Sequence, residues 1–290
     1  MKVHMNDTKE VGQFIPLHYH FAMLYDSDRI AKFRTALDYL LTQDDVVLEL
    51  GGGTGILSFF AAQKAKKVYS VEFNGELVDQ SRHLLKMNKN SDKIEIVHED
   101  AFLYMPPEPV NIVICEMLHV GLLREKQLAM IESFKARYQD HFKGHKLPIF
   151  VPGATLQAVQ PVNHDFNFEG FYAPLPLFQS PYVEDLRTTP LGDPIVYNQI
   201  IYDQPYDLVC RCDETINFTT QGTLNAVRII TKNIIAVEVE KGRTIDWHNQ
   251  YLVLPLDKEI AVSPGKSLSL RFEYTAGDRL SALKPVVKCM

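Results

Sequence analysis

The sequence predicts an α/β protein in which a parallel sheet is followed by an antiparallel β domain. Before residue 150, short β-branched runs alternate with helical segments, an order typical of a parallel sheet with helices on both faces. The run Val46–Leu50 is apolar apart from Glu49, as expected for a strand that is buried on both sides. After residue 150, proline and turn residues separate many strand-like stretches, which predicts an antiparallel barrel or sandwich.

The spacing of apolar side chains places the individual elements. Apolar residues recur at helical spacing from Phe21 to Leu40, which predicts helical structure over residues 20–41. The other elements expected in the first half are strands at 46–50, 68–73, 94–98 and 110–115, with helices at about 56–64 and 77–89. Those expected in the second half are strands at 154–159, 195–202, 215–219, 226–230, 234–240, 251–254 and 268–274.

The length of 290 residues fits one large domain or two modest ones. We expect N-terminal helices over residues 1–42 that cover a cofactor site, and an α/β domain over residues 43–149. A β-barrel-like domain is expected over residues 150–290, and a segment at about 170–193, rich in Pro, Tyr and Phe, is expected to form an arm inserted into it.

Composition and charge exclude several classes of protein. Hydrophobic residues make up 46% and charged residues 23%, which is ordinary for a soluble globular protein and excludes a disordered chain. No apolar run approaches the roughly 18 residues that a membrane helix needs, and no secretory signal is visible. Four scattered cysteines do not suggest a disulfide framework, so we expect a cytoplasmic protein. The net charge of −6 disfavours a nucleic-acid substrate.

A glycine cluster between a predicted strand and a predicted helix indicates a nucleotide-type site. Gly51, Gly53 and Gly55 form a G-x-G-x-G pattern, in which glycine lets the backbone turn tightly and approach a ligand closely. Glu72 ends the next strand, where a carboxylate can accept hydrogen bonds from both ribose hydroxyls of a nucleoside. Without a ligand, the same glycines would simply make a tight turn.

The pattern favours S-adenosylmethionine over a dinucleotide as the cofactor. A dinucleotide site prefers G-x-G-x-x-G, whereas this loop has Ile56 after its third glycine. Glu49 stands two residues before Gly51, where a carboxylate would repel a pyrophosphate but could hold a positively charged aminoacyl group.

At this point a family resemblance becomes visible. The segment Val47–Ser58 resembles the first motif of class I methyltransferases, in the form found in protein arginine methyltransferases. The resemblance implies a seven-stranded, Rossmann-like sheet with S-adenosylmethionine cradled at residues 51–55 and its ribose on Glu72. Asp100 and Ala101 stand where that superfamily contacts adenine; for Asp100, an exposed loop acid is an equal alternative.

Two acids nine residues apart suggest the acceptor. Glu116 ends an apolar strand, at the sheet edge where ligands bind, and Glu125 follows an apolar loop. A guanidinium presents a planar fork of donors, so two carboxylates can hold it and draw its positive charge to one side, leaving the other nitrogen to attack a methyl sulfonium. Protein arginine methyltransferases carry a double-glutamate loop of the same spacing. The resemblance therefore places Glu116 and Glu125 as the pair that grips the substrate.

A third match lies upstream. The segment His20–Arg29 is similar to the family's N-terminal helix pattern H-x-x-M-L-x-D-x-x-R. By resemblance, Arg29 pairs with the methionyl carboxylate of the cofactor, His20 lies near its ribose, and Asp26 faces the acceptor pocket. From the residues alone, His20 would be a polar residue at a helix start and Arg29 a solvated charge.

Three positions depart from the family pattern. Trp247 matches the tryptophan of the family's T-H-W loop and is expected at the acceptor, but Asp246 stands in place of the histidine. That histidine pairs with the acid matched by Asp26. Two carboxylates there would repel or share a proton, unless His248 substitutes. Met117 replaces a common tryptophan, and the Y-F-x-x-Y element aligns with Glu10, Val11 and Phe14.

We therefore expect an S-adenosylmethionine-dependent N-methyltransferase that acts on the guanidino group of a protein arginine. A small guanidine or amine is the alternative acceptor, and a catalytically inactive binding module on the same fold is a third possibility. A nucleic-acid methyltransferase fits least, because Glu-Met-Leu-His follows Cys115 where an Asn-Pro-Pro-Tyr signature would stand. No metal is expected, since Cys210 and Cys212 are too close for zinc spacing. A homodimer is expected, although the arm is shorter than the family's dimerisation arm.

Overall fold

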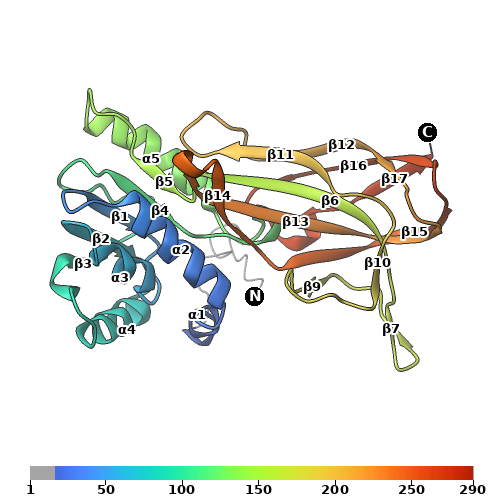
Figure 1. The fold of residues 1–290 in the computed structure, drawn as a ribbon, viewed down its shortest axis with the longest axis horizontal. Helices are drawn as coiled ribbons and strands as arrows, with labels where there is room; N and C mark the ends of the chain where they lie inside the picture. The colour runs from blue at the N-terminus through green and yellow to red at the C-terminus, as the bar shows by residue number, and fades with distance from the viewer. Residues whose placement is uncertain (1–16, 290) are drawn as a thin grey trace, which may run out of the picture.

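The protein, described here from a computed structural model, is an α/β fold followed by antiparallel sheets, as predicted. The structure describes residues 17–289. Figure 1 shows the helices and the parallel sheet at one end of the molecule and the long antiparallel strands at the other. Residues Glu10, Val11 and Phe14 lie outside the described residues.

The helical structure predicted over residues 20–41 is present, as two helices: α1 (Leu17–Met23) and α2 (Ser27–Leu40). The break has a local cause. The carboxylate Oδ1 of Asp26 accepts a hydrogen bond from the backbone N of Arg29 at 3.0 Å, which caps a new helix at this point. Phe33 of α2 is fully buried and anchors that helix against the rest of the fold.

The parallel sheet has the order β3-β2-β1-β4-β5. Its strands are β1 (Val46–Leu50), β2 (Lys67–Glu72), β3 (Ile94–His98), β4 (Ile112–Cys115) and β5 (Ile149–Val151), and its helices are α3 (Ile56–Ala62), α4 (Gly75–Lys86) and α5 (Gln127–His141). Within the described chain the sheet has five strands, so the expected seven were wrong. The reason is that everything after β5 enters the antiparallel part. The strand order reverses between β1 and β4, and ligands bind at such a point in open α/β sheets.

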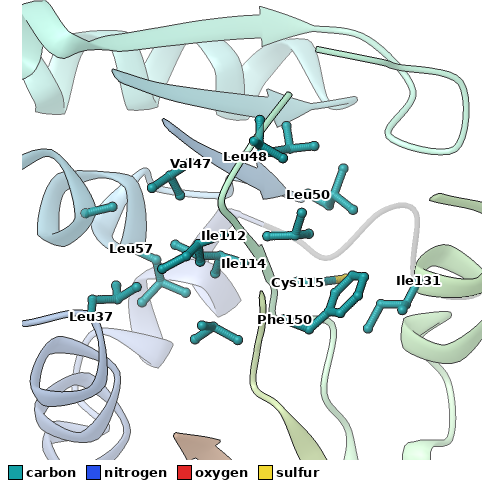
Figure 2. Packing of buried hydrophobic residues seen from close by; sticks show 14 of the residues in the cluster. Leu37, Val47, Leu48, Leu50, Leu57, Ile112, Ile114, Cys115, Ile131 and Phe150 are labelled. Carbon is teal, nitrogen blue, oxygen red and sulfur yellow. The ribbon is translucent and has the colours of Figure 1, made fainter. Parts of the chain in front are cut away.

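The core of this part lies between the sheet and its covering helices. In Figure 2, Ile112 lies beside Leu57 of α3 and Phe150 lies beside Ile131 of α5, and all four belong to one buried hydrophobic cluster. Each fully buried side chain of this size stabilises the fold by about 1.5–3 kcal/mol relative to exposure. The carboxyl ends of β1 and β4 are thereby held on a rigid support.

The antiparallel part contains two facing sheets and a separate two-stranded sheet, β7-β8. The larger runs β10-β6-β13-β15-β9, with β11 paired to β6 and β14 paired to β13; the smaller runs β12-β16-β17. The strands are β6 (Ala154–His164), β7 (Asn167–Phe168), β8 (Phe171–Tyr172), β9 (Leu177–Gln179), β10 (Thr188–Pro190), β11 (Ile195–Ile201), β12 (Val209–Asn217), β13 (Gly222–Glu238), β14 (Arg243–His248), β15 (Tyr251–Val262), β16 (Ser267–Thr275) and β17 (Val286–Cys289). One core, including Val227 and Leu270, joins the two sheets, which is the arrangement of a sandwich.

Several predicted strands differ in extent. The expected strands 226–230 and 234–240 form one long strand, β13, because the polar residues between them do not make a turn. Thr231 and Asn233 are fully buried there and hydrogen-bonded. β14 and β17 were not predicted, and the expected strand 215–219 belongs to β12. The arm at 170–193 contains β8, β9 and β10, and β9 pairs with β15.

The short 3₁₀ helices are η1 (Ser91–Lys93), η2 (Val120–Leu122), η3 (Val239–Lys241) and η4 (Leu280–Ala282). In the part of the chain that the structure describes, no helix is both long enough and apolar enough to cross a membrane. Among the same residues no cluster of His, Cys, Asp and Glu could hold a metal ion. Cys210 and Cys212 are buried free thiols, and burial raises their pKa values to about 11 and about 12.

Candidate active site

A cavity lies at the carboxyl edge of the parallel sheet, where β1 and β4 end next to each other. It encloses about 1290 Å³, including space open to solvent, which is enough for a nucleoside cofactor beside an acceptor group. Most of the residues that were predicted to bind cofactor or acceptor line it. They are His20, Arg29, Glu49, Gly51, Gly53, Glu72, Asp100, Ala101, Glu116 and Glu125.

The glycine loop, residues 51–55, forms the floor of this cavity. Gly51 and Gly53 have φ values of +82° and +54°, a left-handed backbone that side chains rarely adopt. The backbone N–H groups of Gly51 and Gly52 both donate to the carbonyl oxygen of Val71 at 2.9 Å, which holds the loop against β2. The turn therefore depends on glycine, as the sequence predicted.

Three predicted site residues lie outside the cavity lining. Gly55, with φ of +82°, caps α3, and a Cβ there would lie 3.0 Å from Leu85 of α4, so this glycine serves helix packing rather than direct cofactor contact. Asp26 caps α2, and its Oδ2 accepts a hydrogen bond from Nε1 of Trp247 at 3.2 Å. Asp26 and Trp247 thus contact each other, and Trp247 in turn contacts Arg29, which lines the cavity.

Glu72 is oriented by the backbone of the glycine loop. Its Oε2 accepts a hydrogen bond from Gly53 N at 2.9 Å, and its Oε1 accepts one from Asn74 N at 2.8 Å. Each oxygen keeps a second lone pair for a ligand hydroxyl. Asp100 is fixed in a similar way, since its Oδ1 accepts from Phe102 N at 2.9 Å.

Glu49 is a buried acid beneath the glycine loop. Its Oε2 accepts hydrogen bonds from the hydroxyl of Ser58 and from that of Ser70, the latter at 3.2 Å. Burial raises its pKa to about 7, against the opposing effect of these two hydroxyls. The sequence identified Glu49 but not its two serine partners, which lie in the next helix and the next strand.

Arg29 makes a contact that was not predicted. Its guanidinium forms an ion pair with the carboxylate of Glu116, and both side chains are largely buried. The guanidinium also lies over the ring of Trp247, 5.3 Å from the ring centroid. Burial lowers its pKa, while the charges of Glu125 and Asp26 raise it. Its expected pairing with a cofactor carboxylate stays a prediction. Arg29 lines the cavity from which such a carboxylate would be reached.

The predicted conflict between Asp246 and Asp26 does not arise. Asp246 forms an ion pair with Lys232 at 3.1 Å and accepts a hydrogen bond from the hydroxyl of Thr244 at 2.7 Å. Successive residues of a strand point to opposite faces, so Asp246 and His248 on β14 point away from the face that carries Trp247. In the described structure the indole N–H of Trp247 takes the place next to Asp26.

Glu116 and Glu125 are joined by the acid-pair loop, residues 116–125, which has a strained backbone. Leu122 and Arg124 have positive φ values of 53° and 64°, in a region that costs a non-glycine residue about 1 kcal/mol or more. The antiparallel part holds this loop in place. Gly121 N donates to the hydroxyl of Thr231 at 2.7 Å, and the hydroxyl of Tyr274 donates to Gly121 O at 2.7 Å.

Glu125 is buried at the far end of this loop. Burial raises its pKa to about 7, opposed by the positive charges of Arg29 and Arg124. Because Glu116 and Glu125 line the same cavity, the spacing of nine residues does bring both acids to one site.

The rest of the lining is mainly apolar, and sequence reasoning had singled out only Gly52, Thr54 and Met117 among its residues. The full set is Met23, Leu24, Ile30, Gly52, Thr54, Ile56, Leu57, Val71, Phe73, Leu77, Phe102, Met117, Lys126 and Met130. Many are neighbours of predicted residues, and that adjacency was the available signal. Met130 carried none, because its place depends on how α5 packs against the loop.

The residues present fit an S-adenosylmethionine group. A Cβ on Gly53 would lie 3.3 Å from Nδ1 of His20, so the loop has room only for glycine between that ring and the sheet. An acid for ribose hydroxyls, an arginine for a carboxylate and a polar turn at Asp100 line the same cavity. Glu72, Arg29 and Asp100 would hold these three parts of the molecule.

Comparisons with known proteins agree with this arrangement. Residues 47–139 match the family model of a methyltransferase domain. The chain is 27% identical over 266 residues to an uncharacterized protein of Methanocaldococcus jannaschii, covering 92% of this chain and 95% of that protein. It is 31% identical over 185 residues to protein arginine N-methyltransferase 1 of Schizosaccharomyces pombe, covering 61% of this chain and 52% of that enzyme.

Two solved structures share the fold. A chain of the Trypanosoma brucei PRMT1 enzyme–prozyme heterotetrameric complex with AdoHcy has a TM-score of 0.72 at 17% identity, over 94% of this chain and 97% of that chain. Protein arginine methyltransferase 10 of Arabidopsis thaliana has a TM-score of 0.70 at 17% identity, over 90% and 88% of the two chains. Residues 47–139 therefore resemble a methyltransferase domain, and the chain as a whole has the fold of these two protein arginine methyltransferase structures.

Proposed function

We propose that this protein is a class I methyltransferase and that it transfers a methyl group from S-adenosylmethionine to a guanidino nitrogen held by Glu116 and Glu125. One observation carries the proposal. The acid pair lines the same cavity as the glycine loop, and Glu116 already forms an ion pair with a guanidinium, that of Arg29. The site therefore contains the charge and the shape that a planar cation requires.

In this proposal the residues act by binding and orientation. S-adenosylmethionine, when bound, supplies an electrophilic methyl group. Glu116 and Glu125 hold the acceptor guanidinium and keep one of its nitrogens turned toward that methyl group, and such alignment supplies much of the rate. Glu125 also has a pKa of about 7, so it can take up a proton from the acceptor near neutral pH.

A small guanidine or amine is the second candidate acceptor. The acceptor side differs from the family pattern, with Asp246 paired to Lys232 and Trp247 bonded to Asp26. Because the pocket departs from the family pattern at these residues, a small guanidine or amine stays a candidate acceptor beside a protein arginine.

A radiolabelled transfer assay decides between the acceptors. The protein is incubated with methyl-labelled S-adenosylmethionine and either total lysate protein or a low-molecular-weight extract. Label that is recovered from hydrolysed protein as methylarginine supports the protein acceptor, and label only in the extract supports the small molecule. If the cofactor binds but neither pool is labelled, the chain is a binding module and the proposal is wrong.

A homodimer is part of the proposal. The arm exposes large apolar side chains, among them Phe171, Leu175 and Leu186, and exposed apolar groups of this kind mark interaction surfaces. Sedimentation equilibrium of the wild type and of a Leu186→Ser variant tests it, because loss of dimer in the variant would place the interface on the arm. A cytoplasmic location also stays a proposal, based on the free thiols described above.

A further inference from the structure

Gln127 is a buried amide that does not line the cavity but contacts the backbone on both sides of Glu116. It is the first residue of α5 and has no exposed surface. Its Nε2 donates to the carbonyl oxygen of Cys115 at 2.6 Å. Its Oε1 accepts a hydrogen bond from the backbone N of Met117 at 2.9 Å. One side chain thus bridges the two peptide groups that flank the acid.

The side-chain amide of Gln127 has buried hydrogen-bond partners for both its nitrogen and its oxygen. Its Oε1 also accepts a hydrogen bond from the thiol of Cys115 at 3.4 Å, and the side chain is hydrogen-bonded to the hydroxyl of Tyr202. A side-chain amide has two donors and about two acceptor positions, and three of these four positions have hydrogen-bond partners within 3.5 Å here. A buried amide with this many hydrogen-bond partners has a defined orientation.

The contact continues through a buried polar network. The hydroxyl of Tyr202 lies 2.7 Å from that of Thr155, which donates to Asn233 Oδ1 at 2.8 Å. Asn233 Nδ2 donates to Asn249 Oδ1 at 2.8 Å, and Asn249 Nδ2 donates to Leu118 O at 3.0 Å. The network therefore runs from Gln127, just after the acid-pair loop, through the antiparallel part and back to the loop at Leu118.

We propose that Gln127 is a positioning residue for the acid pair: it fixes the peptide groups around Glu116 and thereby the distance from Glu116 to Glu125. Glu125 lies only two residues before Gln127, so the same side chain joins the segment that carries the second acid to the end of β4. This inference rests on the proposed function, because it assigns Gln127 a role in methyl transfer.

The first experiment compares Gln127→Met with the matched variant Gln160→Met. Gln160 is also a buried amide, and it donates to the backbone of Gly192 in the antiparallel part at 2.9 Å. For Gln127→Met we expect a folded protein with cofactor Kd within about twofold of wild type and kcat lower by about 10–100-fold, as for other residues that orient a reacting group. Gln160→Met should leave kcat within about twofold.

The conservative variant Gln127→Glu separates positioning from a structural role. A protonated glutamate can donate to Cys115 O and accept from Met117 N, as glutamine does, whereas the ionised form cannot donate and adds charge beside Glu116 and Glu125. Its neighbours Cys115 and Tyr202 have pKa values raised by burial and stay neutral. The kcat ratio of Gln127→Glu to wild type should therefore rise at least fivefold as the pH falls from 8 to 6. A ratio that does not change with pH would overturn the proposal.

A measurement that needs no acceptor keeps this inference separate from the proposed function. Hydrogen exchange of the Met117 amide should be at least tenfold faster in Gln127→Met than in wild type, and unchanged in Gln160→Met. Unchanged exchange together with unchanged kcat would exclude the role of Gln127. If wild type transfers no methyl group but Gln127→Met still speeds exchange of the Met117 amide, the proposed function is wrong. The role of Gln127 in fixing the peptide groups around Glu116 then still holds.

Discussion

The glycine loop and the acid-pair loop are neighbours at one sheet edge but are held in different ways. Gly51 and Gly52 bond to Val71 in the adjacent strand, and Glu72 bonds back to Gly53, so residues close in sequence stabilise one another. The acid-pair loop instead depends on Thr231 and Tyr274, more than 100 residues away. The glycine loop was recognisable in the sequence because its supporting residues lie nearby in the chain. The residues that support the acid-pair loop were not, because they lie far away in the chain.

The largest expected effect comes from the acid pair itself. Glu116→Gln removes one charge from the grip on the acceptor and should lower kcat by about 100-fold, because alignment and charge-assisted bonds are lost together. Cofactor Kd, measured by calorimetry, should stay within about threefold of wild type. Glu259→Gln, an exposed acid of the antiparallel part, is the matched control and should leave both values unchanged. A Glu116→Gln protein with wild-type turnover would refute the proposed grip.

A glycine substitution tests the other loop. Gly51→Ala meets both a φ of +82° and the side chain of Met117, whose Cε lies 3.0 Å from the new Cβ. We expect cofactor affinity to fall by about tenfold or more, with about 1–2 kcal/mol lost from the free energy of unfolding. Gly144→Ala has a similar φ of +86° but no atom within 4 Å, so it should lose stability alone. If Gly51→Ala and Gly144→Ala changed cofactor affinity equally, Gly51 would have no special role in the cofactor site.

Lowering the pH should affect the acid-pair loop through protonation of Glu125. Its pKa is raised to about 7, so the carboxyl takes up a proton as the pH falls below that value and loses the charge that holds the acceptor. We expect kcat/KM for the acceptor to fall by up to about tenfold per pH unit below 7. In Glu125→Gln this part of the profile should disappear, and a wild-type profile that is flat from pH 8 to 6 would argue against a role for this charge.

The remote support of the acid-pair loop is tested by Thr231→Val. Valine keeps the shape but removes the oxygen that accepts from Gly121 N, leaving a buried donor without its partner. The free energy of unfolding should fall by about 1–3 kcal/mol. If the loop depends on this contact, kcat should fall several-fold while cofactor Kd stays constant. A parallel loss of cofactor affinity would show that the two loops are not independent.

The smallest effect concerns Glu49 and stability. The folded chain holds the proton of this carboxyl up to about pH 7, whereas an unfolded chain releases it near pH 4.3. The folded state therefore binds more protons between these values, and stability falls as the pH rises through this range. Glu49→Gln should lessen that fall by about 1–3 kcal/mol, as measured by urea unfolding at pH 5 and pH 8. An unchanged pH dependence would contradict the raised pKa.

Much of the parallel sheet and its glycine loop was predicted from the sequence. The strands at 46–50 and 94–98 and the glycine pattern were predicted with their bounds, because buried parallel strands and glycine turns leave local signals. The position of the helix break at Asp26 was not predicted, although Asp is a common helix cap, because the apolar spacing continues across it. β13 was divided in two because its central polar residues, Thr231 and Asn233, find buried partners that the sequence does not reveal.

The sequence by itself determined the sheet, the glycine loop and the presence of two acids nine residues apart. Only the tertiary structure decided that Arg29 pairs with Glu116, that Asp246 pairs with Lys232 and that Gln127 holds the peptides around Glu116. The physical reason is the separation along the chain between the residues that interact. A turn or a strand is specified by neighbours in the chain, whereas the partner of a buried charge or amide is whichever group the packing of distant strands brings within about 3 Å.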